Sequence, residues 1–79
     1  MKYLSQGLES AEKVELLLQL TNIRSENIQM ALVDHLVKNF SISDAAVINS
    51  CRQPNLTEAL SSLNKVAEKV EKINEIKHH

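Results

Sequence analysis

The residues best suited to chemistry lie between positions 52 and 65, where small polar side chains accompany two cations. Gln53 and Asn55 could make paired hydrogen bonds to adenine, and Lys65 could bind guanine or phosphate. The outward positions of a helix over this stretch are the candidates for DNA binding: Arg52, Gln53, Asn55, Thr57, Glu58, Ser61, Ser62 and Lys65. An ordinary solvated helix face has the same composition, so the residue types alone leave both interpretations open.

The sequence around these candidates predicts a helix-turn-helix. Ser41 or Ser43 can cap a short helix of about two turns, which ends before a turn at 51–53. Pro54 suits the first turn of the next helix, and apolar residues at alternating steps of three and four extend that helix to about residue 76. In this layout the second helix enters the major groove of DNA and the first crosses the backbone.

Two further helices are expected upstream. Ser10 can cap a helix over about 10–20, whose apolar face is Val14, Leu17, Leu18 and Leu20, and Ser25 can cap one over about 26–39. One Gly and one Pro in 79 residues favour helices over strands. We therefore predict an all-α fold of four helices that includes the helix-turn-helix and a long C-terminal helix.

The predicted organisation has three parts. Residues 1–9 show no periodicity and are expected to be a flexible arm, residues 10–77 a single helical helix-turn-helix domain, and residues 78–79 a purification-tag remnant. A chain of this length has a thin core, so association would add stability. Val66, Val70 and Ile73 continue the apolar stripe of the last helix and are candidates for an oligomer interface. The alternative is that this stripe folds back onto the first helix of the same chain.

The remaining ionisable residues lack the patterns of catalytic or metal sites. His35 has no second ligand three or four residues away, and Cys51, the single cysteine, has no histidine near it in sequence. No Gly-rich phosphate loop occurs. We expect a protein that is not an enzyme and holds no cofactor and no metal. Without a signal peptide or a membrane span, it is expected to be cytoplasmic and nucleoid-associated.

Two stretches share their order of features with a known family. They read LTNIRSENIQMALVDHLVKNFSISDAAV and, after a short break, NLTEALSSLNKV. They contain the pattern hydrophobic, Asp, His, Leu, Val at 33–37, a Ser with an acid three positions on, and the Leu-x-x-Leu spacing of Leu60 and Leu63. In these features the chain from Leu18 to Val66 resembles the PapB/FocB family of fimbrial (adhesin) operon regulators of enteric bacteria.

The resemblance implies an all-helical regulator that binds double-stranded, A/T-rich operator DNA as a cooperative oligomer and activates or represses fimbrial genes. It places the first DNA-proximal helix at 41–50 and the recognition helix at 55–65, with Lys65 matching a basic residue of the family. It also implies basic residues near the start of the short helix and at position 62, where this chain has Ile42, Ser43 and Ser62.

These departures, with a formal net charge of −1, reduce the number of phosphates that the chain can neutralise. Binding would then depend on a homo-oligomer, or on a hetero-oligomer with a more basic related regulator. The alternative function is a helical protein-interaction module, or an antagonist that forms such mixed oligomers without binding DNA itself.

Overall fold

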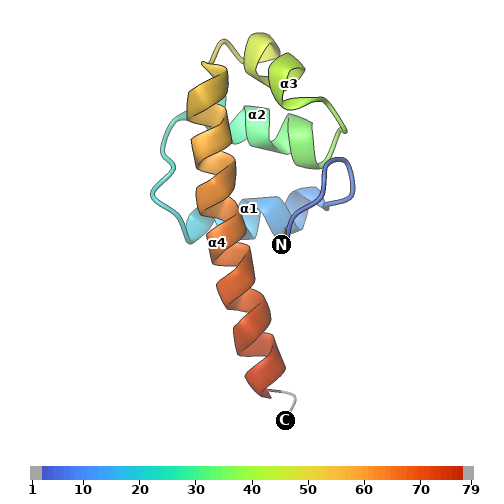
Figure 1. Cartoon of the computed structure of the whole chain (residues 1–79), viewed down its shortest axis with the longest axis vertical. Coiled ribbons are helices and arrows are strands. Elements are labelled where there is room, and N and C mark those ends of the chain that lie inside the picture. The colour runs from blue at the N-terminus through green and yellow to red at the C-terminus, as the bar shows by residue number, and fades with distance from the viewer. Residues whose placement is uncertain (1–2, 78–79) are drawn as a thin grey trace.

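The computed structural model describes residues 3–77 and contains four helices (Figure 1). These are α1 (Ala11–Gln19), α2 (Glu26–Leu36), α3 (Ile42–Ile48) and α4 (Gln53–Lys77). The first part of α4 packs against the other three helices, and its C-terminal part extends beyond them (Figure 1). The predicted all-α fold with a long last helix is confirmed, and residues 3–77 contain no strand. Among those residues, no helix is both long and apolar enough to cross a membrane.

Serine side chains begin three of the four helices, as the sequence predicted. The hydroxyl oxygen of Ser10 accepts from the N–H of Lys13 at 3.1 Å, and Ser25 accepts from Ile28 at 3.3 Å. Ser41 is the cap of α3, since it accepts from Asp44 at 3.1 Å. Each bond satisfies an amide that has no partner inside the helix.

The end of α2 differs from the prediction: the helix stops at Leu36 rather than near residue 39. Asn39 has a φ of 70°, which lies in the left-handed region and outside any right-handed helix. Beyond it the N–H of Phe40 donates to the carbonyl of Asp34 at 3.0 Å, and the buried ring of His35 donates from Nδ1 to the carbonyl of Phe40 at 2.7 Å. These bonds turn the chain back over the end of α2.

The core lies where α4 meets the other helices. Leu32 and Leu36 of α2 and Leu56 and Leu63 of α4 are the largest side chains that are fully buried, together with Val14 of α1. Small residues allow α3 to approach closely, since Ala45 and Ala46 are both buried. The spacing of seven residues between Leu56 and Leu63 leaves the opposite side of α4 facing solvent.

Residues 3–9 pack on the domain, which differs from the flexible arm expected over 1–9. Leu4 is buried in the core. The N–H groups of Gly7 and Glu9 donate to the carbonyls of His35 and Leu36 at 3.1 and 3.0 Å, so the segment satisfies carbonyls that the end of α2 leaves without helical partners. Residues 1–2 and the expected tag remnant at 78–79 lie outside the described residues.

Candidate nucleic-acid interface

Residues 49–52 form the turn between α3 and α4, and hydrogen bonds fix its shape. Ser50 has a φ of 55°. The N–H of Cys51 donates to the carbonyl of Ala46 at 2.9 Å, and the N–H of Ser50 donates to Val47 at 3.2 Å. This is the pattern of a Schellman motif, which ends a helix on a left-handed residue. Cys51 packs half-buried against the core, as a small apolar residue does.

Side chains also hold α3 against its neighbours. The Ser43 hydroxyl donates to Oε1 of Gln53 at 3.1 Å, joining α3 to the first residue of α4. Nδ2 of Asn49 donates to Oδ2 of Asp34 at 2.8 Å, joining the end of α3 to α2. These two bonds hold α3 against both α4 and α2 before any ligand binds.

The structure places every predicted DNA-binding position on the surface. Each of the following is exposed: Arg52, Gln53, Asn55, Thr57, Glu58, Ser61, Ser62 and Lys65. Four of them, with Pro54, line one open groove on α4: Gln53, Thr57, Glu58 and Ser61. Ser62 lies on the other side of this face, in a separate groove beside the loop between α1 and α2.

Cations without an ion-pair partner, Arg52 and Lys65, lie at the two ends of the predicted DNA-binding face of α4. Among the described residues, the cations that form ion pairs are Lys13, Lys38 and Lys72. Arg52 and Lys65 form none, and the first turn of α4 contains no acid. A helix N-terminus carries a partial positive charge, so this end of α4 together with Arg52 favours an anion. Glu58 opposes it from the middle of the face.

The outer face of α3 is much less suited to phosphate. Val47 and Ile48 are 79% and 55% exposed, and Asp44 is exposed in the first turn. The helix contains no Lys or Arg. If α3 crosses a DNA backbone, its contacts there must come from hydroxyl and N–H groups rather than from cations.

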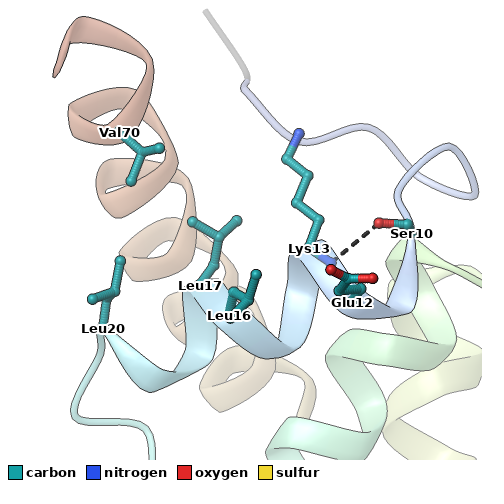
Figure 2. A pocket seen from close by; sticks show the side chains of 7 residues that line it. All are labelled: Ser10, Glu12, Lys13, Leu16, Leu17, Leu20 and Val70. Atoms are coloured by element: carbon teal, nitrogen blue, oxygen red, sulfur yellow. Dashed lines mark hydrogen bonds between the residues drawn. The ribbon is translucent and has the colours of Figure 1, made fainter. Parts of the chain in front are cut away.

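A second surface involves the predicted interface residues. Figure 2 shows Val70 of α4 above Leu17 of α1 and Leu20, the residue that follows α1, where an apolar groove opens between the two helices. Val66 and Val70 are half-buried against the core of their own chain, whereas Ile73 is 53% exposed. Sequence reasoning placed Leu20 on the apolar face of the first helix, yet it is 63% exposed. It also missed Leu16, which is exposed on the rim of the groove.

The comparisons with known proteins bear on the whole described chain. The model of the PapB family, described as adhesin biosynthesis transcription regulatory protein, matches residues 1–77. The crystal structure of Escherichia coli FocB is similar, with a TM-score of 0.84 and 25% sequence identity over 92% of this chain and 83% of that one. None of the curated protein sequences compared with the chain matches it. The chain therefore belongs to the PapB family of adhesin biosynthesis transcription regulators.

Proposed function

We propose that this chain regulates adhesin (fimbrial) gene expression by binding double-stranded, A/T-rich operator DNA as a cooperative oligomer on the cytoplasmic nucleoid. One observation carries the proposal. In a member of a transcription-regulator family, the exposed polar face of α4 follows a hydrogen-bonded turn at the position where a helix-turn-helix presents its recognition helix.

The first turns of α4 would supply the base contacts. Oε1 of Gln53 already accepts from Ser43, so its Nε2 group remains to donate to an acceptor such as adenine N7 or thymine O4 in the major groove. Asn55, two residues on, is exposed and could make paired bonds to adenine. Arg52, just before α4, and Lys65, on its fourth turn, would contact phosphates and fix the register.

Oligomerisation would compensate for the small number of phosphate contacts that each subunit makes. The groove between α1 and α4 and the exposed Ile73 offer an apolar surface of the kind that a second subunit covers (Figure 2). Once one of two joined subunits binds the duplex, the other is held close to it and binds at a high effective concentration. Weak individual contacts could then give a stable complex.

The exposed Val47 and Ile48 favour the second candidate function, a protein-interaction module or antagonist that joins a more basic relative without binding DNA. They lie on α3, where a DNA-binding helix-turn-helix meets the phosphate backbone. An apolar surface without cations suits a protein partner better than a polyanion.

A gel-shift titration with A/T-rich duplexes of increasing length, at two salt concentrations, separates the two functions. We expect a series of shifted bands whose number increases with the length of the duplex and whose intensity decreases at the higher salt concentration. Arg52→Ala with Lys65→Ala should abolish or strongly weaken the shift without changing helicity. Lys38→Ala is the matched control, because Lys38 is exposed but already pairs with Asp34 at 3.5 Å. Unchanged binding by the double variant would show that the surface is wrong, and no shift by the parent at tens of micromolar would favour the second function.

The interface is tested separately by size-exclusion chromatography. Ile73→Asp with Leu20→Asp should convert the oligomer into smaller species, since both side chains are exposed within one chain and charge there would oppose burial against another. Asp at Val70 would be less clean, because Val70 also packs on its own core. An unchanged elution volume with unchanged helicity would contradict the interface.

A further inference from the structure

The loop between α1 and α2 lies beside the outer face of α4. One groove is lined by Leu20, Thr21, Asn22 and Ile23 of the loop region and by Ser62 and Val66 of α4. Asn22 and Ser62 are exposed and can both donate hydrogen bonds. Arg24 directly follows Ile23, so the chain has a cation one residue beyond the loop residues that line this groove.

Hydrogen bonds fix the backbone of this loop. The Thr21 hydroxyl donates to the carbonyl of Leu18 at 2.8 Å and accepts from the N–H of Ile23 at 3.2 Å. Nε2 of Gln29 donates to the carbonyl of Ile23 at 2.8 Å. Ser25 then caps α2. Arg24 thus extends from a backbone held on both sides, which lowers the entropic cost of binding a ligand with its side chain.

After Ser62, the charges of α4 are separated into two flanks. Ser62, Lys65 and Lys69 follow one another at steps of three and four, so they share one face. Glu68, Glu71 and Glu75 follow their own steps of three and four along a different flank, and Glu68 pairs with Lys72 at 3.4 Å. Among the described cations, Arg24, Lys65 and Lys69 have no ion-pair partner, unlike Lys13, Lys38 and Lys72.

We propose that Asn22, Arg24, Ser62, Lys65 and Lys69 form a second DNA contact, a loop–helix site for the phosphodiester backbone that flanks the bases read by the start of α4. The inference rests on the proposed DNA binding and adds Arg24, Asn22 and Lys69 to its surface. Lys65 and Lys69 are about 6 Å apart along the helix axis. This distance is close to two steps of the phosphate spacing along one DNA strand, which is about 3.4 Å per step. Three cations around hydrogen-bond donors match phosphate oxygens better than base edges.

The site also explains how the duplex is held although the outer face of α3 has no cation. The helix itself contains no Lys or Arg to meet a phosphate. The loop–helix site is centred on the groove that contains Ser62, which is separate from the groove that contains Gln53. The duplex would then be positioned mainly from the side of the α1–α2 loop.

The test measures the dependence of DNA affinity on salt, by fluorescence anisotropy of an A/T-rich duplex with the full chain. Removing one cation that neutralises a phosphate should reduce the slope of log affinity against log salt by about 0.9. Arg24→Ala and Lys69→Ala should each show that reduction, and the double variant a reduction of about 1.8. When salt is raised from about 50 to about 200 mM, the affinity of both proteins should fall. The factor by which it falls should be about 12 times smaller for the double variant than for the parent.

Two further variants make the result specific. Arg24→Lys with Lys69→Arg keeps both charges and should keep the parental slope. Lys38→Ala removes one exposed charge that is paired within the chain and should leave the slope unchanged. If the parent binds DNA but the double alanine variant keeps the parental slope, the loop–helix site is wrong. The proposed DNA binding by the polar face of α4 is then unaffected. If the parent shows no binding at either salt concentration, the proposed function fails and this inference fails with it. A reduced slope in the Lys38 control would also overturn it, since the effect would then reflect net charge.

Discussion

Replacing Asn64 with alanine should release the N-terminal segment from α4 and destabilise the domain. Oδ1 of Asn64 accepts from the N–H groups of Tyr3 and Leu4 at 3.1 and 3.0 Å. Its Nδ2 group donates to the carbonyl of Leu60 one turn earlier, at 3.3 Å, which holds the amide in that orientation. Leu4 is only 3% exposed, so the two bonds keep a core side chain in place.

The size of the effect follows from these interactions. Two hydrogen bonds contribute about 1 kcal/mol each, and partial exposure of Leu4 adds about 1 kcal/mol. Alanine is a better helix former than asparagine by about 0.6 kcal/mol, which offsets part of the destabilisation. The net change in the free energy of unfolding is roughly 2 kcal/mol. In a domain of this length it should lower Tm by roughly 10 °C.

Urea unfolding followed by circular dichroism measures the free energy, and hydrogen exchange measures protection of the Tyr3 and Leu4 amides. Asn74→Ala is the matched control, because Asn74 is exposed on the same helix and gains the same helix propensity. It should be neutral or slightly stabilising. If the two variants differ by less than about 0.5 kcal/mol, or if the two amides keep their parental protection in the Asn64 variant, then Asn64 does not hold the segment.

Three other changes test local features of the structure. Gly7→Ala should cost about 1–2 kcal/mol in urea unfolding, because Gly7 has a φ of 70° and an added Cβ would lie 2.6 Å from Oδ1 of Asn39; adding Asn39→Gly should recover part of that stability, and a neutral single variant would argue against the close approach. Glu9→Gln should lower stability at neutral pH and matter less as the pH falls. Burial raises the pKa of Glu9, but the hydrogen bond and ion pair with Lys13 and the hydrogen bond from the N–H of Ser5 outweigh burial and lower the pKa overall. The carboxylate therefore adds stability above its usual pKa and loses it as the pH falls through the lowered one, so a parent–variant difference that grows in acid would contradict this. Glu58→Gln should raise DNA affinity about two- to threefold at low salt, because a carboxylate about 7 Å from a phosphate in water is repelled by roughly 0.6 kcal/mol; an unchanged affinity would place Glu58 away from the duplex.

The starts of the helices could be predicted because their causes are local. Ser10, Ser25 and Ser41 each bond an amide three residues on, so the signal lies within one turn. The packing of residues 3–9 has no such signal, since Tyr3 and Leu4 bond to a side chain about 60 residues away. The end of α2 involves tertiary bonds as well, since the N–H groups of Gly7 and Glu9 donate to the carbonyls of His35 and Leu36.

Some features of the candidate site could likewise be predicted from the sequence, and others depend on how the helices pack. The exposure of the positions on α4 follows from the helical period, because Leu56 and Leu63 fix which side is buried. The place of the α1–α2 loop beside Ser62 depends on how α1 crosses α4, which periodicity does not reveal. The same crossing leaves Leu16 and Leu20 exposed although apolar spacing alone favoured burying Leu20.

The length of α4 would allow the proposed DNA binding and the proposed oligomerisation to occur together. Gln53 begins the face proposed to bind DNA, and Val70 lines the apolar groove shared with α1. The two residues are about 25 Å apart along the helix axis, at about 1.5 Å per residue. Lys69, the last residue of the proposed loop–helix site, points to a different side of the helix from its neighbour Val70, so a duplex that reaches Lys69 would still leave the groove beside Val70 for a second subunit. Ion pairs within the chain neutralise Lys13 and Lys38 on other elements, so the placement of unpaired cations, rather than the formal net charge of −1, decides whether such an assembly can hold DNA.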